Sequence, residues 1–128
     1  MTATPNLKTI FIVEDDESMR EAIETLLRIA GFGSVAFASA EAMLAQGTND
    51  NTLCVISDLR LPTMSGLDLM SEMRLRSWRI PVIIITGHDS PANRQESLRR
   101  GAAAYLPKPF PSKKMLSAIN HILEQQDS

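Results

Sequence analysis

Five short apolar runs alternate with longer amphipathic stretches along this chain, and the alternation is the feature that most restricts its fold. The runs lie at residues 9–13, 34–38, 53–57, 81–85 and 102–106. Short runs rich in β-branched residues are typical of strands buried on both faces. Strict alternation predicts right-handed crossovers, a parallel sheet and helices on both faces. The prediction is a doubly wound α/β fold, for which a common five-stranded order is 2-1-3-4-5.

The stretches between the runs carry signals of helix starts and ends. The expected helices cover residues 18–31, 41–45, 66–76, 91–100 and a last one opened by Pro111, with caps at Ser18, Ser39, Ser65 and Ser90. Ser18 with Glu21, and Ser65 with Asp68, have the capping-box spacing. Gly31 and Gly101 stand where helices end. In the last helix, one face is expected to carry Met115, Ile119, Ile122 and Leu123.

Length and composition limit the class of protein. With 128 residues, 44% of them apolar, the chain predicts one domain over residues 1–128 with its core over about 8–124. A net charge of −2 argues against direct nucleic-acid binding through bulk positive charge. The single cysteine, Cys54, excludes an internal disulfide. Residues 1–6 lack the apolar core of a signal peptide, and no apolar run approaches the ~18 residues of a membrane span. We therefore expect a soluble, cytoplasmic domain without membrane contact.

Polar residues follow four of the five predicted strands at their carboxyl ends. Glu14 and Asp15 follow the first strand, Asp58 the third, Thr86 the fourth, and Lys108 comes shortly after the fifth. In the order 2-1-3-4-5 these ends converge on one edge, where α/β sheets of this kind bind ligands. The sequence thus predicts a cluster of carboxylates with one hydroxyl and one ammonium.

Such a cluster needs a cation. Two like charges ~4 Å apart repel by about 4 kcal/mol at an effective dielectric near 20. Because the donors are all oxygen, the pattern favours Mg²⁺. A carboxylate beside Mg²⁺, an ammonium and a hydroxyl is suited to holding a phosphoryl group. Taken singly, Asp58 would be read as an ordinary turn residue, and Asp16 and Glu17 as acids that complement a helix dipole. The joint placement of the four strand-end groups favours a site.

Four segments resemble a known family. They are FIVEDDESMR (11–20), VISDLRLPTMSGLDLM (55–70), VIIITG (82–87) and GAAAYLPKPF (101–110). Their order and spacing resemble the CheY-like response-regulator receiver domain of two-component signalling, over roughly residues 8–123. The short sequences ITGH (85–88) and KPF (108–110) are most similar to those of receivers from FixJ-type transcription regulators.

The resemblance implies a role for each strand-end residue. Asp58 would be the phosphoacceptor, and Lys108 would pair with the phosphoryl group. Mg²⁺ would be held by Asp58, by the acidic pair Glu14 and Asp15, with Asp15 favoured as the direct ligand, and by the backbone carbonyl of Arg60. Glu14 replaces the family's usual aspartate, so its longer side chain is expected to reach the ion through water.

The resemblance also implies a switch. Thr86 would bond the phosphoryl group and move on activation, and Tyr105 would be the aromatic residue whose rotamer follows it. If the resemblance to the family is set aside, Tyr105 fits equally well as a half-buried aromatic residue of a strand. The surface of the fourth helix, fifth strand and fifth helix would then change its binding preference. The Lys108–Pro109 bond would be cis.

The implied protein is a signalling switch and not a classical enzyme. It would take its phosphoryl group from a sensor histidine kinase or a histidine phosphotransfer protein and lose it by slow autodephosphorylation. A phosphorylation-dependent homodimer is a further expectation. Arg60 and His88 would flank the route of the attacking water; we expect Arg60 to shield the phosphoryl group, and His88 to be an exposed loop residue.

Three alternatives stay open. The chain could be the receiver fragment of a longer FixJ-type DNA-binding regulator. It could be a degenerate receiver that binds partners without phosphorylation, which the replacement at Glu14 allows and the other site residues oppose. An Mg²⁺-dependent aspartyl phosphohydrolase is disfavoured, because Arg60 occupies the position where that class carries an acid. The remaining arginines are read as a solvated face: Arg74, Arg76, Arg79, Arg94, Arg99 and Arg100.

Overall fold

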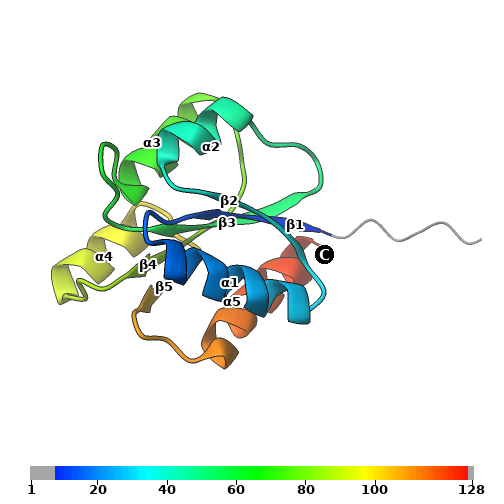
Figure 1. Cartoon of the computed structure of the whole chain (residues 1–128). Coiled ribbons are helices and arrows are strands. Elements are labelled where there is room, and N and C mark those ends of the chain that lie inside the picture. The colour runs from blue at the N-terminus through cyan, green and yellow to red at the C-terminus, as the bar shows by residue number, and fades with distance from the viewer. Residues whose placement is uncertain (1–7, 127–128) are drawn as a thin grey trace, which may run out of the picture.

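Ten secondary-structure elements alternate along residues 8–126, the part of the chain that the computed structural model describes (Figure 1). In chain order they are β1 (Thr9–Val13), α1 (Glu17–Ile29), β2 (Gly33–Phe37), α2 (Ala40–Gln46), β3 (Thr52–Asp58), α3 (Gly66–Leu75), β4 (Val82–Thr86), α4 (Pro91–Arg99), β5 (Ala104–Pro107) and α5 (Ser112–Gln126). The predicted alternation is confirmed, with most boundaries shifted by one or two residues.

The five strands form one parallel sheet in the order β2-β1-β3-β4-β5. The predicted order is therefore confirmed. Its centre is the pair β1 and β3, in which Val13 lies opposite Ser57. The next pair places Asp58 opposite Ile85. These registers bring the carboxyl ends of β1, β3 and β4 to nearly the same level of the sheet.

Alternating strand residues build one core on each face of the sheet. On one face, Phe11, Val55 and Ile84 pack with residues of α2 and α3. On the other, Ile12 and Ile56 pack with residues of α1 and α5. Figure 1 shows α2 and α3 on one side of the sheet and α1 and α5 on the other. This arrangement follows from the two-residue period of side chains along a strand.

The caps of the later helices follow the predictions, while that of α1 differs. Ser39 and Ser90 accept bonds from backbone amides of α2 and α4, and Ser65 forms the expected capping box with Asp68. At α1, however, Asp16 is the cap, and its carboxylate accepts from the Met19 amide at 2.8 Å. The prediction that Ser18 caps this helix is wrong. Starting two residues earlier gives the first turn an acidic cap beside the positive end of the helix dipole.

The last strand also starts later than predicted. Ala102 belongs to the turn that ends α4, where Gly101 has a φ of 99° and the Ala102 amide donates to the Ser97 carbonyl at 3.0 Å. The Ala103 amide already donates to the Val82 carbonyl of β4 at 2.8 Å, and the strand begins at the next residue. β5 consequently extends to Pro107, which lies opposite Thr86. Proline lacks an amide donor, and it is tolerated here because β5 is an edge strand.

The helices differ in how firmly they are held. α5 buries Met115, Ile119 and Ile122, and Leu123 packs at the edge of the same core, as predicted. By contrast, α4 buries only Ser97. Few buried apolar contacts make α4 the helix most easily displaced from the sheet. Within residues 8–126, none of the helices has both the length and the apolar character that crossing a membrane requires.

Candidate functional site

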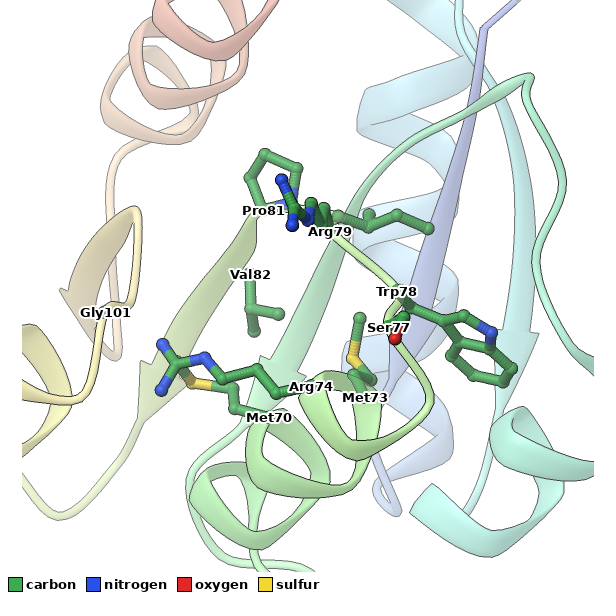
Figure 2. A pocket seen from close by; sticks show the side chains of 10 residues that line it. Met70, Met73, Arg74, Ser77, Trp78, Arg79, Pro81, Val82 and Gly101 are labelled. Carbon is green, nitrogen blue, oxygen red and sulfur yellow. The ribbon is translucent and has the colours of Figure 1, made fainter.

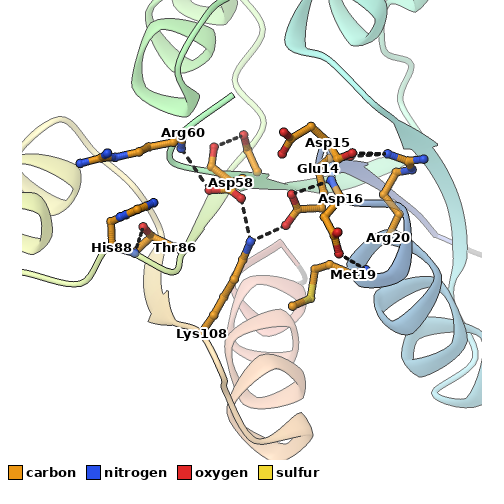
Figure 3. Close-up of polar contacts among 11 residues, drawn as sticks. Glu14, Asp15, Asp16, Met19, Arg20, Asp58, Arg60, Thr86, His88 and Lys108 are labelled. Atoms are coloured by element: carbon orange, nitrogen blue, oxygen red, sulfur yellow. Dashed lines mark hydrogen bonds and ion pairs between the residues drawn. The ribbon is translucent and has the colours of Figure 1, made fainter. Parts of the chain in front are cut away.

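Lys108 holds two carboxylates together at the carboxyl edge of the sheet (Figure 3). Its Nζ lies 2.5 Å from Oε1 of Glu14 and 2.7 Å from Oδ2 of Asp58. Both carboxylates are buried, with Glu14 0% and Asp58 6% exposed. Lys108 comes from the loop after β5, so residues from three separate strand ends meet at one ammonium. The predicted convergence is thus present in the structure.

Asp15 completes an all-oxygen cluster with these two acids. One carboxylate oxygen from each of Glu14, Asp15 and Asp58 lies within 4.8 Å of the others. Asp15 is exposed, whereas its two partners are buried. Lys108 contacts two of these three carboxylates, and among the described residues it is the one cation in an ion pair with them. The excess negative charge and the hard donors fit a divalent cation such as Mg²⁺.

Local backbone contacts fix the positions of the acids. The second oxygen of Glu14 accepts from the Asp16 amide at 3.2 Å, and one oxygen of Asp58 accepts from the Arg60 amide at 3.0 Å. Arg20 donates to the carbonyls of Glu14 and Asp15 at 2.8 and 3.1 Å. Arg20 therefore orients the acidic turn without touching the carboxylates. Sequence reasoning missed it, since a basic residue in the first turns of a helix gives no sign of folding back.

Gly66 was likewise missed as a residue that shapes the site. A Cβ atom there would lie 2.5 Å from the Asp58 carbonyl oxygen. The Gly66 amide also donates to the Leu59 carbonyl at 2.9 Å. Only glycine lets the start of α3 approach the end of β3 this closely. The available signal was a glycine directly after a capping serine, which also fits an ordinary helix start.

Burial and hydrogen bonds act in opposite directions on the pKa values of Glu14 and Lys108. Burial raises the pKa of Glu14 to about 7, although bonds from Lys108 and the Asp16 amide oppose the rise. Burial alone would lower the pKa of Lys108, but bonds and charges from Asp58 and Glu14 outweigh it and raise that pKa. Lys108 therefore stays charged at neutral pH, while Glu14 keeps its proton to a higher pH than an ordinary glutamate does, because its pKa is raised by burial.

We expect Glu14→Gln to change how the stability of the metal-free protein depends on pH. The pKa of Glu14 is raised from 4.5 to about 7, so the folded state binds this proton more tightly than the unfolded chain. The free energy of unfolding should consequently fall as pH rises from 4.5 to about 7, by about 3 kcal/mol from this group. Urea unfolding in chelator between pH 5 and 8 measures this slope. The glutamine variant should lack this contribution. Glu21→Gln, at an exposed position on α1, should keep it, and parallel curves for wild type and Glu14→Gln would contradict the assignment.

The hydroxyl predicted at the end of β4 is buried next to this cluster. Thr86 is 0% exposed, and its Oγ1 accepts from the His88 amide at 2.9 Å. The Lys108 amide donates to the Thr86 carbonyl at 2.7 Å, which joins the ends of β4 and β5. His88 itself is exposed, as expected, and so is Arg60. Figure 3 shows Arg60 and His88 on the same side of Asp58.

Tyr105 lies on β5, and its ring is buried to 5% exposure. Its hydroxyl donates to Asp89 at 2.9 Å, and the guanidinium of Arg94 lies 5.7 Å from the ring centre. Burial and the bond to Asp89 raise the pKa of Tyr105. Asp89 is three residues after Thr86, so one short loop contacts both residues of the expected switch. The Lys108–Pro109 peptide bond is cis, as expected.

Comparison with known proteins agrees with this geometry. The family model of the response regulator receiver domain matches residues 10–120. The nodulation protein W of Bradyrhizobium diazoefficiens is 41% identical over 110 residues, covering 86% of this chain and 48% of the relative. The transcriptional regulatory protein FixJ of the same organism is 32% identical, covering 92% and 58%. The crystal structure of FixJ-N superposes with a TM-score of 0.84 at 33% identity, covering 94% of this chain and 96% of that one. The chain spans about half the length of the curated relatives it matches.

Proposed function

The chain belongs to the response regulator receiver domain family, and we propose from that premise that Asp58 is the carboxylate on which it accepts a phosphoryl group. The donor we propose is a phosphohistidine on a sensor kinase or a phosphotransfer protein. The observation that carries the proposal is the Lys108 ammonium, which contacts the Asp58 and Glu14 carboxylates at 2.7 and 2.5 Å. In this proposal the ammonium, which contacts the accepting carboxylate, also supplies positive charge to the incoming phosphoryl group.

The residues have separate tasks in the transfer. An oxygen of Asp58 attacks phosphorus, the bond from phosphorus to the histidine nitrogen breaks, and an acyl phosphate forms on Asp58. The Arg60 amide holds one oxygen of the attacking carboxylate at 3.0 Å. Lys108 stabilises charge on the phosphoryl oxygens, and Thr86 donates its hydroxyl hydrogen to one of them. Positioned groups of this kind lower the barrier because they need no reorganisation during the reaction.

We propose that Mg²⁺ is held directly by the carboxylates of Asp15 and Asp58 and by the backbone carbonyl of Arg60. Glu14 would hold the ion through a water molecule. The ion would neutralise charge between Asp58 and the phosphoryl oxygens. The donor set fits a hard cation, since three carboxylate oxygens lie within 4.8 Å of one another.

We expect Mg²⁺ to raise the melting temperature of the protein and Asp15→Asn to remove most of that rise. A ligand at ten times its dissociation constant stabilises the folded state by about 1.4 kcal/mol, which for a domain of this size raises the melting temperature by about 5 °C. Differential scanning fluorimetry with Mg²⁺ and with chelator measures the shift. Asp50→Asn, an exposed acid far from the cluster in the turn before β3, should respond like wild type. An equal rise in Asp15→Asn would place the ion elsewhere.

The phosphorylated state would alter the surface of α4, β5 and α5. If Thr86 moves to donate its hydroxyl hydrogen to the phosphoryl group, it shifts the oxygen that now accepts from the His88 amide at 2.9 Å and so disturbs this loop. Because Asp89 holds the Tyr105 hydroxyl from the same loop, movement of the loop changes the support of the ring. α4 buries only Ser97, so it can follow at low cost. We propose that this surface then prefers a second phosphorylated copy, which forms a homodimer.

We propose that Arg60 slows loss of the phosphoryl group. Its side chain is exposed, and its backbone amide contacts Asp58 at 3.0 Å, so in this proposal the side chain hinders the approach of an attacking water. Arg60→Ala should speed decay of the phosphorylated protein by about three- to tenfold, because water gains access to phosphorus. Decay followed on phosphate-affinity gels after removal of the donor measures this rate. Arg28→Ala, an exposed arginine of α1, is the matched control. Decay at the wild-type rate in Arg60→Ala would reject the shielding role.

The central experiment is chemical phosphorylation of the whole chain. Acetyl phosphate or phosphoramidate should give a retarded band on a phosphate-affinity gel with Mg²⁺ and none with chelator. A protein that is not labelled under either condition would support the degenerate receiver and overturn the proposal. Turnover of a phosphomonoester would support the phosphohydrolase, which Arg60 disfavours. A DNA-binding regulator containing this domain would change the output and leave the chemistry at Asp58 as proposed.

A further inference from the structure

A cavity of about 360 Å³ opens at the amino-terminal edge of the sheet, away from the acidic cluster (Figure 2). Val82 lines it at the start of β4, whereas Thr86 ends the same strand at the acidic edge. The other walls come from the end of α3, the segment that leads into β4, and Gly101 after α4. The volume lies within the range of small-molecule sites.

The cavity joins an apolar floor to cationic walls. Met70, Met73 and Val82 form the floor and are at most 4% exposed. Arg74 and Arg79 line the cavity as well. Among the described residues that line it, none is an aspartate or a glutamate. A ligand with an apolar body and a negatively charged group therefore matches both the apolar floor and the cationic walls.

These two guanidiniums differ from Arg76 and Arg99, two other arginines of the predicted solvated face, in having no carboxylate partner among the described residues. Arg99 is paired with Glu96 at 2.8 Å, and Arg76 with Glu72 at 3.4 Å. Arg74 donates to the backbone carbonyl of Arg100 and has no carboxylate partner within residues 8–126. The same range of the structure contains no ion-pair partner for Arg79. Positive charge beside the cavity is thus left without a carboxylate.

Ser77 adds a second and independent observation. It follows α3 with a φ of 60°, in a left-handed turn closed by bonds from the Ser77 amide to Arg74 and from the Trp78 amide to Met73, both at 2.9 Å. The corresponding positions after α1 and α4 are Gly31 and Gly101. Glycine adopts this conformation without strain, whereas serine does not. The strained serine places a hydroxyl donor on the cavity wall.

We propose that this cavity binds a small organic carboxylate. The carboxylate would accept bonds from the Arg79 and Arg74 guanidiniums and the Ser77 hydroxyl. Its apolar body would cover Trp78 and Ile80, which line the cavity and are partly exposed. An inorganic anion would leave the partly exposed apolar side chains of Trp78 and Ile80 in contact with water, so the lining argues for an organic ligand. The site is separate from the phosphoacceptor and does not depend on its chemistry.

Trp78 provides the test, because it is the only tryptophan of the chain and lines the cavity. We expect saturable change of its fluorescence on titration with cyclohexanecarboxylate, with a dissociation constant in the millimolar range. Cyclohexanecarboxamide, the neutral probe of the same shape, should bind about tenfold more weakly, because charge-assisted bonds are lost. Amide NMR shifts should concentrate in residues 70–82 and 101.

Variants assign the contacts. Arg79→Ala should weaken cyclohexanecarboxylate binding by about tenfold, and Arg28→Ala, the control on α1, should leave it unchanged. Ser77→Gly should weaken binding while its melting temperature stays equal or rises, which excludes misfolding as the cause. Asp58→Asn should bind like wild type, which separates this site from the proposed phosphoacceptor. Equal affinity for acid and amide, unchanged affinity in Arg79→Ala, or the absence of a saturable response would each overturn the proposal.

Discussion

Asp58→Asn is expected to abolish the Mg²⁺-dependent band that acetyl phosphate or phosphoramidate produces on a phosphate-affinity gel. The asparagine side chain has nearly the size of the aspartate side chain. Its oxygen can still accept the hydrogen bond that the Arg60 backbone amide now donates to Asp58 at 3.0 Å. It lacks the charged nucleophilic oxygen, so no acyl phosphate can form. The loss should be complete, and the fold should be retained because volume and shape are preserved.

The matched control is Asp50→Asn, which should be labelled like wild type. Mass spectrometry of the labelled wild-type protein should place the added phosphate on the peptide that contains Asp58. A band that persists in Asp58→Asn would show that another group accepts the phosphate, and the site would then need reassignment.

Lys108→Met is expected to lower the free energy of unfolding by about 3 kcal/mol at pH 8 in chelator. Removing the ammonium leaves Glu14 and Asp58 as neighbouring buried carboxylates, 0% and 6% exposed, without their shared cation. Breaking one side of a buried ion pair is costly because the remaining charge stays desolvated. Urea unfolding of both proteins gives the difference directly.

The pH dependence of this loss identifies its cause. At pH 5 the loss should shrink, because Glu14, whose pKa is already raised to about 7, takes up a proton and removes the repulsion. Mg²⁺ should restore part of the stability by supplying another cation. Lys113→Met, at an exposed position of α5, should have little effect. A Lys108→Met protein as stable as wild type at pH 8 would show that the ammonium does not compensate these acids.

The sequence predicted where these side chains gather, because their position depends on strand order. Once β1 and β3 are neighbours, Glu14 and Asp58 must leave the sheet at the same edge, whatever the details of the loops. Lys108 was placed there by the same rule. That this ammonium bridges two buried carboxylates depends on the loop after β5 and could not be predicted from the position of the strand.

Errors arose where two local signals competed. Ser18 and Asp16 are both good caps, and only the folded chain selects Asp16. Ala102 was predicted to begin the last strand, but its amide bonds back to Ser97 in the turn that ends α4. Arg79 had been read as part of a solvated face, and only the structure places it at a cavity with an apolar floor.

The amino-acid sequence by itself determined the alternation of strands and helices, the buried faces and the edge at which the acids gather. These features follow from side-chain periodicity and from the handedness of crossovers, which act over short stretches of chain. Only the tertiary structure decided the contacts of Lys108, the approach of Gly66 to Asp58, the bond from Tyr105 to Asp89 and the cavity beside Arg79. Such contacts join residues far apart in the chain, and their distances are set by the packing of whole elements, which no local pattern encodes.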